Sequence, residues 1–181
     1  MRYPCGGYPP GPVTKMKAGQ VIDVRFYASA MKSNDLKKQP KLSKSTKQFA
    51  QARHGGGMCE FSLSYDGGKS YRLIGRYSKT CPDSYYTWPV RIPKNAKSCT
   101  KKNQCLFVWT WTAAVVPQFY MNCADIQLSG AKNGVYPPRK GIQVYNIKGH
   151  KKKVFPGDGQ KHKAGPGPNK KEINNNMNDR F

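Results

Sequence analysis

The chain has 181 residues, which fits one domain with a tail or two small domains and is enough to bury a hydrophobic core. It carries 32 Lys and Arg residues against 9 Asp and Glu residues, a formal net charge of +23. This charge favours polyanionic partners, although a solvated surface without a specific partner is an open alternative. No segment approaches the roughly 18 apolar residues of a membrane span.

The six cysteines are an even number, which is compatible with three disulfides and therefore with a secreted or cell-wall protein. No pair has CxxC spacing, so a zinc ribbon lacks its basic unit. The start, "MRYPCGGYPPG", contains no apolar stretch typical of a signal peptide. We therefore interpret Met1 as an artificial start or as the edge of a truncated gene.

The first half of the chain predicts irregular segments around one strand. Residues 1–12 are rich in Pro, Gly and Tyr and are expected to be irregular. Residues 21–27 alternate in the manner of a half-buried strand that follows a turn at Gly19. Residues 31–53 hold seven basic residues and one acidic residue, which favours an exposed loop.

Short strands then follow closely. The segment "MCEFSLSYDGGKSYRLIGRY" predicts a hairpin over residues 58–77 with a turn at Asp66-Gly67-Gly68. "YYTWPVRIP" predicts another strand, and a local Cys99–Cys105 bridge can close the basic loop after it. "CLFVWTWTAAVV" is apolar enough for the middle of a sheet, with Trp109 and Trp111 on one face as core residues.

"FYMNCADIQLSG" is the last strand that the pattern predicts firmly. From residue 131 onward there are twelve basic and three acidic residues among many Pro, Gly and Asn. "GIQVYNI" is compatible with one short strand, and the rest has the composition of a poorly packed basic tail. We predict a β-sandwich over residues 1–130, followed by a tail over 131–181. The fold class is all-β, an antiparallel β-sandwich with long loops.

Five segments occur in the order and spacing of a known family. They are "CGGYPPG", "ARHGGGMCEFSLSYDGGKSYRLI", "CPDSYYTWPVRIP", "CLFVWTWT" and "QFYMNCADIQLSG". Together they resemble fungal lytic polysaccharide monooxygenases, in particular the chitin-active auxiliary-activity family eleven. The resemblance covers roughly residues 3 to 130 and leaves out the basic loop and the tail.

The resemblance implies a secreted immunoglobulin-like sandwich that binds chitin or a related β-1,4-glycan on a flat face. It also implies a copper cofactor held by a histidine brace, in which a second histidine joins the amino group and ring of an N-terminal histidine. By position, His54 matches the second histidine and Tyr120 the axial tyrosine. The implied disulfides are Cys59–Cys81 and Cys5–Cys123. Imidazole suits copper, and the glycines after His54 allow a sharp turn.

The chain departs from the family at its start, where "MRYP" stands in place of a histidine. His150 and His162 lie among lysines and are expected to be exposed tail residues that do not replace the missing ligand. One imidazole and one tyrosine would bind copper weakly. We therefore expect oxidative glycan cleavage only when an N-terminal histidine is present, and no activity from the sequence as written. The "FN" that follows the central strand in the family is replaced by Thr112-Ala113-Ala114.

Two further functions stay open. The first is a non-catalytic glycan-binding or structural wall protein, with Tyr8, Tyr85 and Tyr86 as exposed rings for sugar stacking and with lysines that retain it on anionic wall polymers. The second is a polyanion or nucleic-acid binder, which ranks lower because the basic clusters lie apart from the strand aromatics. Hydrolase chemistry is disfavoured: Asp66 is a turn residue and Asp125 points outward, so no carboxylate pair stands out.

Overall fold

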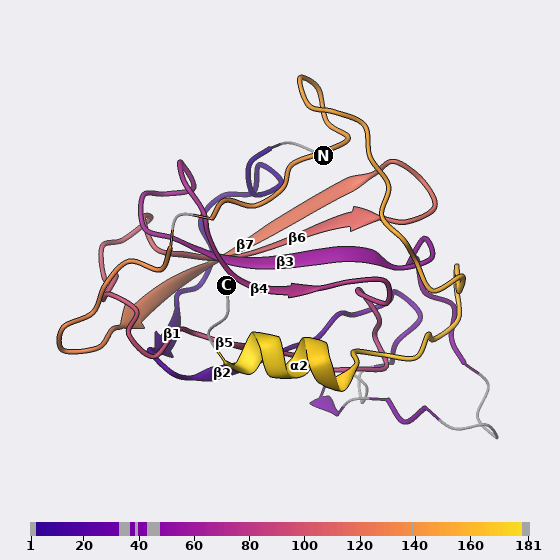
Figure 1. Ribbon diagram of the computed structural model, residues 1–181, viewed down its shortest axis with the longest axis horizontal. Coiled ribbons are helices and arrows are strands. Elements are labelled where there is room, and N and C mark those ends of the chain that lie inside the picture. The colour runs from indigo at the N-terminus through magenta and orange to yellow at the C-terminus, as the bar shows by residue number, and fades with distance from the viewer. Residues whose placement is uncertain (1–2, 33–36, 39, 43–47, 139, 179–181) are drawn as a thin grey trace.

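The computed structural model describes residues 3–32, 37–38, 40–42, 48–138 and 140–178. Its elements are β1 (Thr14–Lys17), β2 (Val21–Val24), β3 (Gly57–Ser64), β4 (Arg72–Tyr77), β5 (Trp88–Arg91), β6 (Leu106–Ala113), β7 (Phe119–Ser129) and α2 (Lys170–Met177) (Figure 1). The strands form a five-stranded sheet, in the order β1-β7-β6-β3-β4, and a two-stranded sheet of β2 and β5. The predicted all-β sandwich is confirmed. One pair departs from the antiparallel pattern, because β1 joins β7 in parallel.

The central position of β6 follows from its sequence. Its eight residues are nearly all buried, and it lies between β3 and β7, as its apolar and aromatic composition predicted. Cys59 on β3, Trp111 on β6 and Tyr120 on β7 are successive register partners across the three strands. This register brings the candidate site residues to one end of the sheet.

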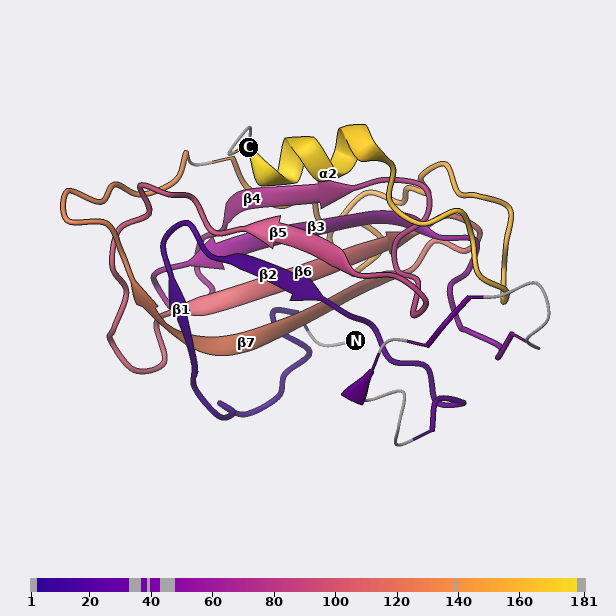
Figure 2. The ribbon, with the colours of Figure 1, turned by 90° about the horizontal axis from the view of Figure 1, so that it is seen from below.

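The inner core fills the space between the two sheets, which Figure 2 shows crossing face to face. Phe61, Tyr77, Trp88 and Val90 are fully buried there. The rings of Tyr77 and Trp88 meet edge to face at 5.1 Å. Burying one such aromatic or branched side chain stabilises the fold by about 1.5–3 kcal/mol relative to leaving that side chain exposed to water.

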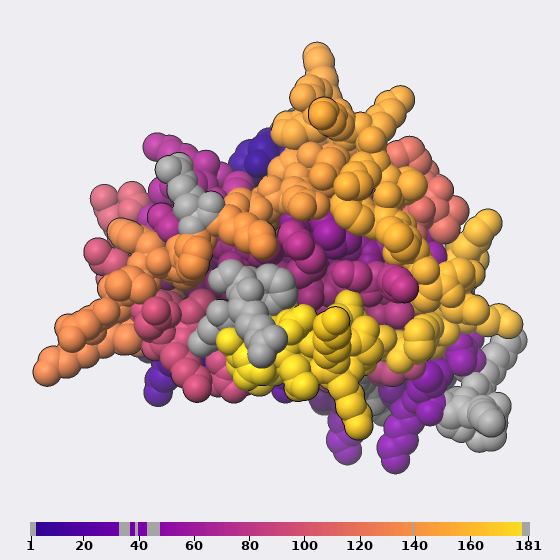
Figure 3. All heavy atoms as spheres, viewed as in Figure 1, coloured from indigo at the N-terminus to yellow at the C-terminus, as the bar shows by residue number. Residues whose placement is uncertain are grey.

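The outer face of the large sheet is also covered. All eight residues of β3 are buried, so both of its faces exclude water. Tyr71, Leu106, Val108, Phe119 and Met121 form an outer cluster against which Ile142, Val144 and Ile147 pack. In Figure 3 the orange residues after 140 lie over part of this side of the molecule.

One expectation about residues 131–181 is wrong for the part that the structure describes. The segment "GIQVYNI" forms no strand, because the Gln143 N–H bonds the side chain of buried Glu60 at 2.7 Å instead of a neighbouring strand. Its apolar residues are half-buried against the outer cluster of the sheet, whereas residues 148–163 are mostly exposed. The domain boundary at residue 130 remains a prediction.

The three disulfides join Cys5 to Cys123, Cys59 to Cys81 and Cys99 to Cys105. The first closes a loop with a sequence separation of 118 residues and ties the N-terminal segment to β7. In the chain-entropy view, a crosslink over a loop of this length stabilises the fold by about 4 kcal/mol or more. No helix among the described residues has the length and apolar character needed to cross a bilayer.

Helix α2 protects the edge strand β4. It begins with a capping box between Asn169 and Glu172, and it packs on β4 and β5. The Asn176 side chain is 1% exposed and bonds the backbone of Arg76 in both directions: its Oδ1 accepts from Arg76 N–H at 2.6 Å and its Nδ2 donates to Arg76 O at 2.8 Å. The amide thus takes the place of a neighbouring strand.

We expect Asn176→Ala to lower the free energy of unfolding by about 1–3 kcal/mol, because it leaves the Arg76 backbone groups unpaired. Urea denaturation followed by tryptophan fluorescence measures the change. Asn174→Ala is the matched control, since Asn174 is exposed on the same helix. Equal stability of the two variants would contradict the strand-mimic interpretation.

Candidate functional site

The candidate site is built on a turn over residues 53–57 in which four successive residues have positive φ. His54 has φ +47°, although it is not a glycine, and Gly55, Gly56 and Gly57 follow it. A Cβ on Gly56 would lie 1.9 Å from the carbonyl oxygen of Lys79, so only glycine fits there. A histidine in this conformation costs on the order of 1 kcal/mol or more, so its surroundings must hold it.

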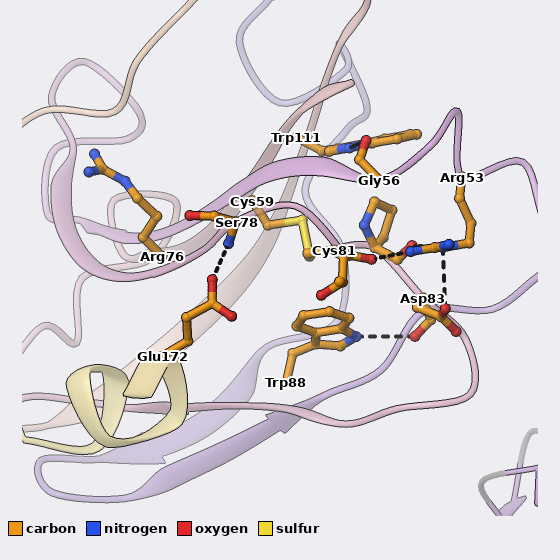
Figure 4. Close-up of a disulfide and its surroundings, with 12 residues drawn as sticks. Arg53, Gly56, Cys59, Arg76, Ser78, Cys81, Asp83, Trp88, Trp111 and Glu172 are labelled. Atoms are coloured by element: carbon orange, nitrogen blue, oxygen red, sulfur yellow. Dashed lines mark hydrogen bonds and ion pairs between the residues drawn. A yellow bond between two sulfur atoms is a disulfide. The ribbon is translucent and has the colours of Figure 1, made fainter. Parts of the chain in front are cut away.

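Backbone hydrogen bonds hold the turn against the connection between β6 and β7. Val115 N–H donates to His54 O at 3.0 Å, and Ala114 N–H donates to Gly56 O at 3.0 Å. The indole Nε1 of Trp111 donates to the same Gly56 oxygen at 3.1 Å, and Figure 4 shows the two residues side by side. The position of the His54 backbone is therefore fixed by the end of β6.

The rings of His54 and Tyr120 both stack on Trp111. The His54 ring centroid lies 5.7 Å from that of Trp111, at an interplanar angle of 16°. Tyr120 lies 4.8 Å from Trp111 at 18°, and its hydroxyl donates to Gln118 Oε1 at 2.7 Å. The structure thus brings together the two residues that the sequence singled out, with a tryptophan as their common neighbour.

Behind the turn, Arg53 is the centre of a buried polar network (Figure 4). Its guanidinium is 1% exposed and pairs with Asp83 at 3.2 Å and with Asp158. It also donates to Pro82 O at 3.1 Å and to Thr80 O. Because arginine stays charged, burial requires that its donors be matched in this way.

Asp83 is fully buried and takes hydrogen bonds from several sides. Tyr85 N–H donates to its Oδ1 at 2.9 Å, and Gly165 N–H donates to its Oδ2 at 2.8 Å. Burial raises the pKa of the Asp83 carboxyl, while these donors and Arg53 oppose the shift. Asp83 therefore holds the network in place, because both of its carboxylate oxygens accept hydrogen bonds from within the protein.

The C-terminal segment 157–167 closes over the turn from the other side. Asp158 N–H donates to Gly55 O at 2.9 Å. A Cβ on Gly157 would lie 2.2 Å from the same oxygen, so the two backbones are in close contact. Gln51 N–H donates to His162 O at 2.8 Å, which extends the contact toward the start of the turn. Residues after 131 therefore help to position His54.

The loop at 31–53 is not exposed at its end. Gln51 and Arg53 are buried, against the expectation from composition, because both bond the Asp83 carboxylate. Arg53 and Asp158 were not predicted as part of the site. The available signal was that Arg53 stands directly before His54 in "ARHGGG".

The rings of the other two histidines have different neighbours from the His54 ring. His162 Nδ1 is 3.2 Å from Gln51 O, and the His150 ring lies 6.0 Å from that of Tyr3. Within the described residues, no group of three His, Cys, Asp or Glu side chains could hold a metal ion. The described chain therefore offers copper one imidazole with a tyrosine nearby, and this donor set does not by itself fit a copper brace.

The three tyrosines predicted to stack on sugars lie in different surroundings. Tyr8 is 75% exposed. Tyr85 is 7% exposed and stacks on Phe49 at 4.4 Å, so its expected exposure is wrong. Tyr86 is half-buried, and its hydroxyl donates to Gly165 O at 2.7 Å. Tyr8 lines a hollow with Cys123 and Asp125, whereas Tyr86 lines another with Pro89 and Ile173, so the three do not form one platform.

A cleft of about 320 Å³ lies beside the turn and was not predicted. It is lined by residues of four segments, among them Phe26, Arg53, Pro82, Trp109 and Trp111. The indole N–H of Trp109 has no hydrogen-bond partner among the described residues. That nitrogen is shielded from solvent, so the cleft offers a ligand aromatic walls without this donor.

Comparison with known proteins supports a relationship to polysaccharide monooxygenases. No family model matches the chain. The chain is 42% identical over 81 residues to "AA11 family lytic polysaccharide monooxygenase A" of Aspergillus fumigatus. The match covers 44% of this chain and 34% of that relative, so the chain spans about a third of the curated relative that it matches.

We expect Arg53→Met to lower the free energy of unfolding by about 3–5 kcal/mol, because Asp83 and Asp158 would remain buried without their cation. Asp158→Asn keeps the shape and removes one charge, so it should cost less and still fold. Urea denaturation measures both, and Lys161→Met, at an exposed position, is the control.

A second measurement connects the network to His54. The His54 ring resonances in an NMR spectrum should shift in Asp158→Asn and stay in place in Lys161→Met. Unchanged His54 resonances in Asp158→Asn would show that segment 157–167 does not position the turn.

Proposed function

We propose that this chain is the sandwich of a secreted protein of lytic polysaccharide monooxygenase type that binds chitin or a related β-1,4-glycan. The observation that carries the proposal is the turn at His54. The backbone of this residue is in the left-handed region, and its ring stacks on Trp111, as does the ring of Tyr120. The identity shared with a polysaccharide monooxygenase supports the same reading. The three disulfides fit an extracellular location.

In this proposal His54 would be one copper ligand, and Tyr120 would lie near the metal. Bound copper would supply the redox chemistry with oxygen or peroxide. The described residues provide one of the nitrogen donors, so oxidative cleavage requires an N-terminal histidine in addition to His54. This chain's own residues orient the imidazole: Val115 fixes its backbone, and Trp111 supports its ring.

Glycan binding is proposed for the surface next to the turn. The cleft walls at Phe26, Trp109 and Trp111 supply aromatic surface. Tyr8 is exposed enough to stack on a sugar ring, whereas Tyr85 is not. The ring of Tyr86 is partly accessible, but its hydroxyl already donates a hydrogen bond to Gly165 O.

A second function is a non-catalytic glycan-binding protein of the cell wall or matrix. A sandwich of this kind can bind a polysaccharide surface through its aromatic residues without copper. The two functions share the glycan and differ in the metal, so they can be separated by measuring each one alone.

We expect the protein to be retained on insoluble chitin in the presence of a metal chelator. Phe26→Ala with Tyr8→Ala should reduce the retained fraction severalfold, because sugar stacking on an aromatic ring contributes about 1 kcal/mol or more. Depletion of the protein from solution at increasing chitin loads is the measurement. Tyr136→Ala, at another exposed ring, is the control. Failure to bind any insoluble β-1,4-glycan would overturn the proposal.

Copper binding is tested by titration with Cu²⁺ and electron paramagnetic resonance. The chain should give a weak site that His54→Ala removes and that His162→Ala leaves unchanged. N-terminal sequencing and intact mass of the protein from its native source then decide between the functions. A mature chain that starts with histidine should release oxidised oligosaccharides with a reductant, and any other start would favour the non-catalytic function.

A further inference from the structure

A lysine loop, defined here as residues 146–153, projects from the molecule at the top of Figure 1. Lys148, His150, Lys151 and Lys152 are all exposed. The protruding spheres at the top of Figure 3 belong to this part of the chain. Its cationic groups are therefore gathered at a protruding part of the surface, where a large partner can contact them.

The loop is ordered by its own hydrogen bonds. The Asn146 side chain accepts from Lys153 N–H at 2.7 Å and donates to Lys153 O at 2.5 Å, which closes the loop at its base. Asn146 N–H donates to Lys151 O at 3.0 Å. Ile147 anchors the loop by packing on the outer cluster of the sheet. The lysines thus project from a fixed backbone, and less conformational entropy is lost when a partner binds.

Within the described part of the chain, no carboxylate forms an ion pair with a lysine of the loop. Among the residues that the structure describes, the ion pairs involve Arg53 and Arg76, and none involves Lys148, Lys151 or Lys152. Closely spaced ammonium groups without a counter-charge repel one another, and this repulsion is relieved when a polyanion binds.

The loop flanks the candidate site. A surface hollow is lined by residues 146–150, by Lys152 and by Pro117 of the connection between β6 and β7. The same connection bonds His54 through Val115 N–H. A polymer chain that contacts the His54 turn can therefore continue onto the lysine loop.

We propose that the lysine loop is a docking site for an acidic polysaccharide, a glycan that carries carboxylates along its chain. Lysine ammonium groups act as point charges, which suits spaced carboxylates on a polymer. Stacking with the bases of single-stranded nucleic acid needs free aromatic faces. The aromatic rings at the loop's base, Tyr145 and Phe155, are covered by Lys153 Nζ at 5.2 and 4.7 Å. This inference goes beyond the proposed function and does not depend on copper.

The test is the binding of polygalacturonate to the whole chain at low salt, measured by isothermal titration calorimetry. The triple variant Lys148→Gln, Lys151→Gln, Lys152→Gln should raise Kd roughly ten- to a hundredfold, because the local field that concentrates the polymer is removed. The wild-type affinity should fall steeply with added salt. The exposed positions make misfolding of the variant unexpected, and circular dichroism checks it.

A second triple variant, Lys17→Gln, Lys101→Gln, Lys102→Gln, has the same net charge and changes exposed lysines on β1 and in the loop after Cys99. It should change Kd less than about threefold. An equal loss in both triple variants would show that net charge alone binds the polymer and would overturn the proposal.

Asn146→Ala keeps every charge but releases the base of the loop, and it should also weaken polygalacturonate binding. Chitin retention should be the same in all of these variants, so a failure here is distinct from a failure of the proposed function. If single-stranded DNA or anionic vesicles bind more tightly than polygalacturonate and lose affinity in the first triple variant, the acidic polysaccharide is the wrong partner.

Discussion

The buried guanidinium of Arg53 is the constraint on which the rest of the site depends. A charge that cannot be neutralised by deprotonation must be matched inside the protein, and Asp83 and Asp158 match it from opposite directions. Asp83 belongs to the segment after β4, whereas Asp158 belongs to the C-terminal segment. One side chain therefore holds together three parts of the chain around the turn that carries His54. The candidate site is thus shaped by an interaction behind it.

The C-terminal residues have a structural role because the large sheet has two apolar faces. The inner face is covered by β2 and β5, and the outer cluster needs a cover of its own. Ile142, Val144 and Ile147 supply it, even though their surroundings in the sequence are rich in Lys, Gly and Pro. A segment with the composition of a disordered tail is folded here because the sheet provides the hydrophobic partner that it lacks by itself.

Local patterns predicted most of the strands, but not β1 or its parallel pairing with β7. The hairpin over residues 58–77 and the central position of β6 follow from alternation and from aromatic content, which act over a few residues. The resemblance singled out His54 and Tyr120, but their common stack on Trp111 was not predicted, because Trp111 was expected only as a core residue. The pairing of Arg53 with Asp158, 105 residues later, could not be predicted, because no local period encodes it. For the same reason the burial of Tyr85 against Phe49 was missed.

The identity of residue 54 argues for a role of its side chain. A turn that needs positive φ at four successive positions is built most easily from glycine, and three of the four residues are glycine. The histidine at the first position adds backbone strain. Among the described residues, its ring makes no hydrogen bond that would offset this strain. Val115, Trp111 and the Arg53 network stabilise this arrangement without any metal. The imidazole is thus held ready at the surface, which is what a ligand for an external partner requires.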